Sequence, residues 1–285
     1  TKIPELKGEY EIGEMLEVED IYGIYYVYVP ETLFAESEIL VVVHGTPAND
    51  KTAEETAKYY LEQWHGYSED TGSIIIAPTF NQENFSSRYG EIEDAMTGYR
   101  GLFGREIDAD EWVLRIVKSY QRAISKSEQE FNLYGHSAGG QFVGRFLVRH
   151  PAYVRKAVIS SAATYPQPNS EIAWPFGMGE MRAEIVWDEK TTKSVTVIPD
   201  EQKWLEATRI AATVIVGMND TAGQPERPGQ RGANRITIGR NWVEDMQQYA
   251  QENGVECRYE FEMIPGKGHS MSGLIEYVQL AMVEK

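Results

Sequence analysis

The sequence predicts an α/β fold in which a mostly parallel central sheet carries helices on both faces. Short apolar runs alternate along the chain with longer segments of helical spacing, which is typical of strand–helix repeats. The runs at 39–44 and 74–77 are apolar almost throughout, as expected for strands buried on both faces. Alternating Tyr, Val and Ile at 10–18 and 21–29 predict an antiparallel hairpin that precedes the parallel part.

The other elements follow in the same alternating order. Residues 52–66 have helical spacing, and residues 108–125 begin with acidic residues, as helices often do. Further strands are predicted at 131–134, 154–160, 214–216 and 257–263, and further helices at 141–150, 238–253 and 270–282.

One domain is expected to contain all 285 residues, because a single large α/β domain of this length is ordinary. Two irregular stretches follow predicted strands. Residues 163–199 contain several prolines and tryptophans and predict a cap-like insertion. Residues 221–235 contain three Gly, two Pro and three Arg and predict a second loop insertion.

The composition limits the possible partners. A formal net charge of −17 disfavours nucleic acid and anionic lipid surfaces, so a neutral or cationic substrate fits better. No apolar run approaches the roughly 20 residues that cross a bilayer. Cys257 is the only cysteine, which excludes an intramolecular disulfide. A soluble protein is expected, and the start at Thr1 fits both a trimmed cytoplasmic chain and one secreted after signal removal.

The first chemical motif is G-H-S-A-G at 135–139, which lies directly between a predicted strand and a predicted helix. This is the context of a nucleophile elbow, in which a strained turn exposes a serine at the sheet edge. The flanking glycines are needed because side chains there would collide with the neighbouring elements. Ser137 is therefore the predicted nucleophile, and a plain glycine-rich turn is the alternative.

The second motif is H-G-T-P at 44–47, directly after the buried strand 39–44. In an elbow architecture this loop supplies one amide of the oxyanion hole, and the residue after the nucleophile supplies the other. The amides of Thr46 and Ala138 are therefore the predicted donors. A simple turn at the end of the strand is the alternative.

A serine nucleophile needs a general base, and the chain has five histidines. His136 and His44 lie inside the two motifs, and His65 and His150 lie at the ends of predicted helices. His269 follows the last predicted strand and is the predicted base. A surface-loop histidine is the alternative interpretation.

The catalytic acid should follow a strand between nucleophile and base. Asp220 comes directly after the buried strand 214–216, where its carboxylate can orient the imidazole. Asp188 and Asp200 compete for this role, although both lie in or beside the first insertion. Asp220 is the predicted acid, and the start of an Asx turn is its alternative role.

These motifs, together with the longer stretch Y-G-H-S-A-G-G-Q-F at 134–142 and G-H-S at 268–270, resemble the α/β-hydrolase superfamily along nearly the whole chain. Within it they are similar to bacterial esterases of the polyhydroxybutyrate-depolymerase-like and feruloyl-esterase-like kinds. The resemblance implies hydrolysis of carboxylic esters without a metal or an organic cofactor.

The functional expectation is a serine hydrolase that cleaves a small-molecule or oligomeric ester through an acyl-enzyme. A small peptidase or aminopeptidase on the same fold is the enzymatic alternative, and a non-catalytic binding module is the alternative from another class. No phosphate loop and no spaced metal-ligand pair occurs, so neither cofactor nor metal is expected. Trp174, Phe176 and Trp187 are expected either to bind substrate or to anchor the packing of the insertion. The oligomeric state stays open.

Overall fold

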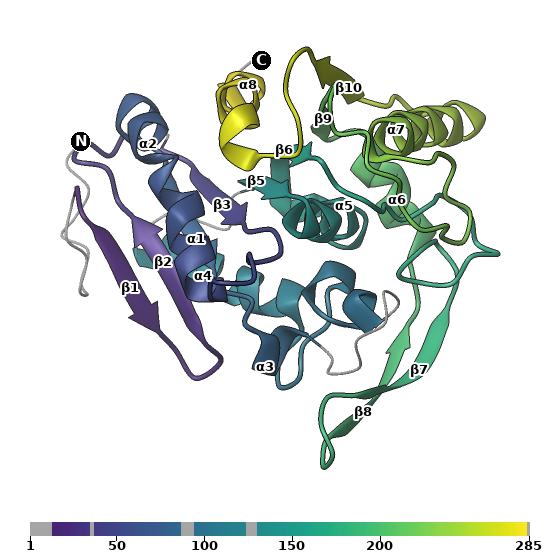
Figure 1. Cartoon of the computed structure of the whole chain (residues 1–285), viewed down its shortest axis with the longest axis horizontal. Coiled ribbons are helices and arrows are strands. Elements are labelled where there is room, and N and C mark those ends of the chain that lie inside the picture. Colours follow the sequence, from purple (N-terminus) through teal and green to yellow (C-terminus); the bar gives the residue numbers. More distant parts are fainter. Residues whose placement is uncertain (1–12, 35–36, 87–93, 124–129, 284–285) are drawn as a thin grey trace.

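The computed structural model describes residues 13–34, 37–86, 94–123 and 130–283. Its main sheet runs through the molecule, and a separate two-stranded hairpin projects from one side (Figure 1). The strands of the main sheet are β1 (Met15–Glu19), β2 (Ile24–Tyr28), β3 (Ile39–Val43), β4 (Ile74–Pro78), β5 (Phe131–His136), β6 (Val154–Ser160), β9 (Ala211–Gly217) and β10 (Tyr259–Ile264), and the hairpin is β7 (Met181–Val186) with β8 (Thr192–Val197).

The strand order in the main sheet is β1-β2-β4-β3-β5-β6-β9-β10. β1 pairs antiparallel with β2 and β2 antiparallel with β4, whereas the other pairs are parallel. The predicted fold class is therefore confirmed, including the antiparallel start. Residues 10–12 of the predicted first strand lie outside the described residues.

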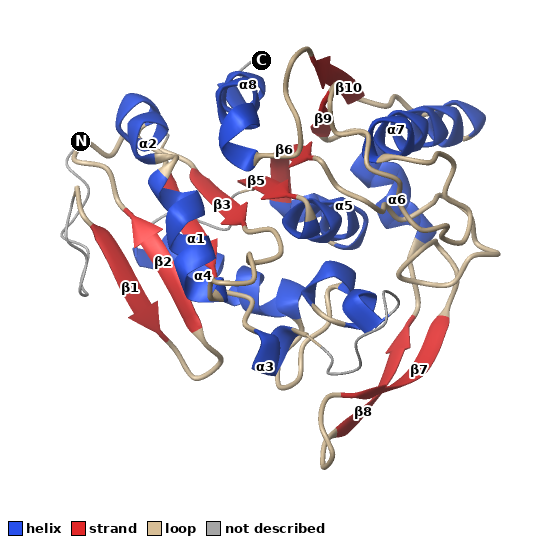
Figure 2. Ribbon diagram, in the orientation of Figure 1, coloured by secondary structure: helices blue, strands red, loops and turns tan. Residues whose placement is uncertain are grey.

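Helices cover both faces of this sheet (Figure 2). The alternation of strand side chains explains why β3 is apolar throughout: Leu40 and Val42 face one helical layer, whereas Val41 and Val43 face the other. The helices are α1 (Ala53–Glu62), α2 (His65–Thr71), α3 (Gln82–Phe85), α4 (Ala109–Ala123), α5 (Ala138–Arg149), α6 (Glu201–Thr208), α7 (Arg235–Glu252) and α8 (Met271–Val283), with short 3₁₀ turns η1 (Asp94–Thr97), η2 (Tyr99–Gly101) and η3 (Pro151–Tyr153).

The parallel register brings the predicted chemical residues to one edge of the sheet. Val43 at the end of β3 is paired with Gly135 of β5, and Gly217 at the end of β9 is paired with Ile264 at the end of β10. The loops that follow these four strands consequently leave the sheet at the same, carboxyl edge. This is the edge at which open α/β sheets bind their ligands.

The two predicted insertions differ in structure. Residues 163–199 form irregular loops and the β7–β8 hairpin, which extends away from the sheet (Figure 1). Residues 221–234 form a loop between β9 and α7 that is paired at its base by a bridge between Gly223 and Asn234. Helix α7 begins at Arg235, three residues before the predicted start, because Asn234 forms a capping box with Thr237.

Candidate active site

The turn that carries Ser137 is strained in the way that the elbow motif predicts. Ser137 has φ 55° and ψ −113° and separates β5 from α5. A Cβ at Gly135 would lie 2.2 Å from the carbonyl oxygen of Gly139, and a Cβ at Gly139 would lie 2.1 Å from that of Val43. Both flanking positions therefore require glycine, because the chain segments approach each other too closely for a side chain.

His269 and Asp220 are in direct contact. The Nδ1 atom of His269 lies 2.8 Å from Oδ2 of Asp220, whose side chain is only 2% exposed. An ionised carboxylate can only accept, so Nδ1 carries the proton and Nε2 is left with a free lone pair. The imidazole thus has the tautomer that a general base needs.

The surroundings of Asp220 favour its ionised form despite its burial. Burial alone would raise the pKa of Asp220, but the hydrogen bond from His269 and the positive charge of Arg235 outweigh it and hold the pKa below its usual value. Arg235 donates from Nη1 to the second carboxylate oxygen, Oδ1, at 3.0 Å. Both oxygens of the buried carboxylate are therefore engaged.

The competing carboxylates have local structural roles. Asp188 accepts from the backbone of Lys190 and pairs with Arg105 at 2.9 Å in the turn between β7 and β8. Asp200 is the N-cap of α6 and accepts from the amide of Gln202. Neither lines the cavity beside Ser137.

The loop after β3 is held in one conformation by a buried histidine. Nδ1 of His44 donates to the carbonyl of Gly45 at 2.7 Å, and Nε2 accepts from the amide of Phe80 at 3.0 Å. Burial lowers the pKa of His44 to about 4, so this ring stays neutral. The side-chain oxygen of Thr46 accepts from Arg100 at 2.6 Å. The Gly45–Thr46 peptide is consequently fixed on both sides.

The two predicted oxyanion donors belong to the loop after β3 and to the start of α5. Thr46 and Ser137 line the same cavity, and Ala138 is the first residue of α5. An amide in the first turn of a helix has no acceptor within the helix, and the helix dipole places partial positive charge at that end. This arrangement can stabilise an oxyanion that forms on a carbonyl bound to Ser137.

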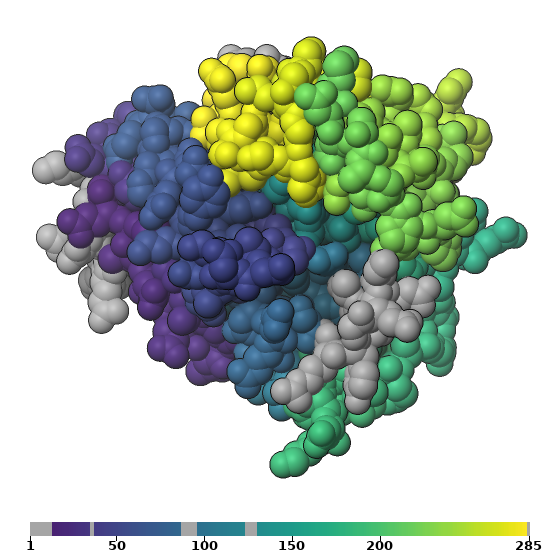
Figure 3. Space-filling view, viewed as in Figure 1, coloured from purple at the N-terminus to yellow at the C-terminus, as the bar shows by residue number. Residues whose placement is uncertain are grey.

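A cavity of about 740 Å³ joins these groups. In the space-filling view, teal atoms from the middle of the chain lie recessed between blue atoms of the first third and yellow atoms of the C-terminal segment (Figure 3). Many of the lining residues come from α1 and from the segment that leads into α8. The lining residues are Gly45, Thr46, Ala48, Lys51, Glu55, Thr56, Tyr59, Tyr60, His136, Ser137, Arg235, His269, Ser270, Met271 and Ser272.

The three aromatic residues predicted to bind substrate are not among these lining residues. Trp174 is 2% exposed, donates to the carbonyl of Gly101 and lies under the guanidinium of Arg149. Trp187 is 3% exposed, and Phe176 is half-buried in the same insertion. The structure does not bring them together with Ser137.

The other histidines have partners other than Asp220. His136 lies beside His269, with ring centres 5.1 Å apart, and contacts the hydroxyl of Ser160; burial lowers its pKa to about 3. His65 stacks on Tyr28, and His150 contacts Asp110 at 2.6 Å. Within the described ranges, no group of three or more His, Cys, Asp or Glu side chains is placed to hold a metal ion. None of the helices described is both long and apolar enough for a transmembrane span.

Comparison with solved structures identifies the architecture. A poly(3-hydroxybutyrate) depolymerase from Bordetella parapertussis superposes with a TM-score of 0.70 at 22% identity, over 91% of this chain and 83% of the other. The chain has the α/β-hydrolase fold. Poly(aspartic acid) hydrolase-1 from Sphingomonas sp. KT-1 gives 0.69 at 22% identity, over 92% and 93% of the two chains. A fluorophosphonate-binding serine hydrolase of Staphylococcus aureus gives 0.55 at 15% identity, over 94% and 96%.

No family model matches the sequence, and no curated protein matches it either. These α/β-hydrolase likenesses are all below 25% identity, so they establish the fold and not the substrate. Motifs and chain order predict Ser137, His269, Asp220, Thr46 and Ala138 from the sequence. They do not predict Arg235, Tyr59 and Tyr60, and the nearest signal for Arg235 is the presence of three arginines in residues 221–235.

Proposed function

We propose that the chain is a serine hydrolase that cleaves carboxylic esters through an acyl-enzyme. The observation that carries the proposal is one constellation: Ser137 sits on a strained turn at the head of a helix and shares a cavity with His269, which is bonded to the buried Asp220. A nucleophile, a correctly tautomerised base and an orienting acid are the parts that acyl transfer needs.

The reaction follows from these positions. Nε2 of His269 takes the proton of the Ser137 hydroxyl as the oxygen attacks the ester carbonyl, and the amides of Thr46 and Ala138 stabilise the oxyanion. The tetrahedral intermediate expels the alcohol, which receives the proton from His269. Water then attacks the acyl-enzyme by the same route and releases the acid.

Two features support an ester as substrate. Solved structures with this fold include a thermostable esterase and an acetyl xylan esterase from Aspergillus awamori, in addition to the depolymerase. A cavity of about 740 Å³ is within the range of roughly 300 to 1,000 Å³ that holds small ligands. It therefore fits a small ester or the end of an oligomer.

The test is turnover of p-nitrophenyl esters from acetate to octanoate, together with labelling by a fluorophosphonate probe. Ser137→Ala should remain folded, lose the label and lose about 10⁴-fold or more in kcat, because the three residues act as a unit. Faster turnover of aminoacyl p-nitroanilides than of esters would favour a peptidase. Absence of both turnover and label would favour a non-catalytic module.

A further inference from the structure

We infer that Arg235 is a positioning residue for the Asp220–His269 pair, and that its charge sets the pH above which His269 is free to act as a base. The inference rests on the proposed function, because it concerns the base of the same site. It adds a fourth side chain to the three that the motifs predict.

The contact between Arg235 and Asp220 spans a loop that is closed at its base. The two residues are fifteen positions apart, yet Nη1 and Oδ1 lie 3.0 Å from each other. Gln224 donates to the carbonyl of Ala233 at 2.8 Å, and Gly223 forms a bridge with Asn234. Because Arg235 is the first residue of α7, its backbone is fixed both by this pairing and by the helix.

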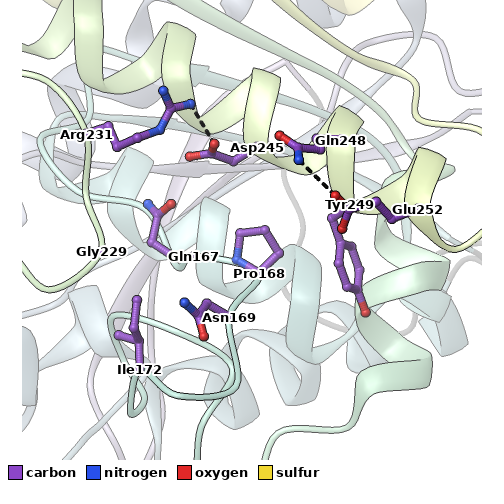
Figure 4. Close-up of a pocket in the computed structure, with 10 residues that line it drawn as sticks. All are labelled: Gln167, Pro168, Asn169, Ile172, Gly229, Arg231, Asp245, Gln248, Tyr249 and Glu252. Atoms are coloured by element: carbon purple, nitrogen blue, oxygen red, sulfur yellow. Dashed lines mark hydrogen bonds and ion pairs between the residues drawn. The ribbon is translucent and has the colours of Figure 1, made fainter.

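The outer part of the same loop is attached to α7 at a second place. Arg231 donates to Asp245 at 2.6 Å, and the side chain of Asn241 donates to the carbonyl of Arg231 at 3.0 Å. Figure 4 shows Arg231 directed at Asp245, beside a shallow pocket that contains none of the three predicted catalytic residues. Of these two arginine–aspartate contacts, the one made by Arg235 involves the partner of His269, and the one made by Arg231 does not.

The charge balance at the site depends on Arg235. The side chain of Asp220 is 2% exposed and that of Arg235 is 16% exposed, so solvent screens this pair weakly. With neutral His269 the Asp220–His269 pair carries one buried negative charge, which Arg235 neutralises. Without Arg235, that uncompensated charge would hold a proton on His269 more tightly.

The other groups around the pair do not change charge in the relevant range. His136 from β5 stays neutral because burial lowers its pKa to about 3. Tyr165, from the loop after β6, stays protonated because burial raises its pKa. Asp220 and Arg235 are consequently the charged side chains in direct contact with one another at His269, whereas Lys51 and Glu55 line the wider cavity and are the same in every Arg235 variant.

Removal of the charge should shift the protonation of His269 to higher pH. Unit charges on the order of 7 Å apart at an effective dielectric of about 20 to 40 give a shift of roughly 0.9 to 1.7 pH units. Arg235→Met and Arg235→Gln should both show it, since each removes the charge. Arg235→Lys should stay within about 0.3 pH units of the wild type while losing part of kcat, because an ammonium lacks the planar fork of the guanidinium.

The experiment is NMR titration of histidine imidazole signals in the full chain, with the His269 signal assigned from its loss in His269→Gln. His44 and His136, with pKa values of about 4 and 3, stay neutral from pH 5 to 9. The signals of His65 and His150 are told apart from that of His269 because they remain in His269→Gln. The acid limb of the pH profile of kcat/KM, measured on a p-nitrophenyl ester, should shift to higher pH by the same amount as the titration of His269. Arg231→Met is the matched control, because it removes the other arginine–aspartate contact of the loop and should leave both curves unchanged.

The inference is overturned if His269 titrates within about 0.3 pH units of the wild type in both neutral variants, or if Arg231→Met shifts it equally. A structural role alone would lower the unfolding temperature of all three Arg235 variants without separating Lys from Met and Gln. The titration needs no substrate. If the wild type neither hydrolyses esters nor binds the probe, the proposed function fails, and the titration still decides this inference.

Discussion

Asp220→Asn is expected to inactivate the site by reversing the tautomer of His269. Arg235 can only donate hydrogen bonds, so the amide oxygen of the new side chain must face Nη1 of Arg235. The amide nitrogen then faces Nδ1 of His269, which has to accept. The ring proton moves to Nε2, and His269 can no longer take the proton of Ser137.

The magnitude follows from the loss of the correct tautomer. An acid-to-amide change of this kind lowers kcat by about 10⁴-fold, which corresponds to about 5.5 kcal/mol of transition-state stabilisation. The assay is kcat and kcat/KM on p-nitrophenyl butyrate at pH 8, with thermal unfolding measured beside it to show that the variant is folded. Asp188→Asn and Asp200→Asn serve as controls, since their carboxylates bond within a turn and at a helix start.

A second variant tests the reason for the loss. In Asp220→Asn combined with Arg235→Met, the guanidinium no longer holds the amide oxygen away from His269, so the amide can rotate and accept from Nδ1. At least tenfold of the lost kcat should return. The reasoning is refuted if Asp220→Asn retains more than a tenth of the activity, if either control loses as much, or if the double variant shows no recovery.

Three further predictions concern packing and specificity. Gly139→Ala should lower the free energy of unfolding in urea by about 2 to 3 kcal/mol. Gly268→Ala should change this free energy by less than about 1 kcal/mol, because a Cβ there meets nothing within 4 Å. Equal effects would contradict the close approach of the backbone at Gly139. Ser137→Gly should be about 1 kcal/mol more stable than Ser137→Ala, because glycine relieves the φ of 55°; a less stable glycine variant would exclude this strain. Tyr59→Ala removes a cavity-lining ring that is 44% exposed, and it should lower kcat/KM about fivefold for the octanoate ester relative to the acetate ester. Trp187→Ala should lower the unfolding temperature and leave the ratio of the two kcat/KM values unchanged. The reverse pattern would assign substrate contact to the insertion.

The sequence predicts most of the fold because its signals are local. The buried strands β3 and β4 are apolar throughout, and Pro151 ends the helix after the elbow, so each is visible in a short window. The β7–β8 hairpin and α6 were not predicted. The hairpin strands lie outside the main sheet and lack a continuous apolar run, since β8 is mostly polar with apolar residues only at Val195 and Val197. Helix α6 has only eight residues, which is short for a periodic pattern.

The candidate site also contains residues that local sequence signals predict and residues that they do not. Motifs that follow predicted strands mark Ser137 and the loop at 44–47, and the order of acid and base along the chain predicts Asp220 and His269. The structure brings Asp220 and His269 into contact, and their catalytic roles stay predictions. No sequence motif marks the residues of the cavity wall. Tyr59 lies on an ordinary helical segment, and nothing in the sequence shows which of three loop arginines returns to Asp220, because that depends on how the loop closes.

The strand order has a consequence for how the protein is made. His269 follows β10, which lies at the edge of the main sheet and, within the part of the chain that the structure describes, pairs with β9 alone. Asp220 can therefore receive its imidazole partner only after β10 and the loop that follows it have left the ribosome. Contacts between residues so far apart in sequence form slowly during folding. Recovery of ester turnover after dilution from denaturant should consequently lag behind recovery of helical circular dichroism, and its rate would report the docking of the final strand.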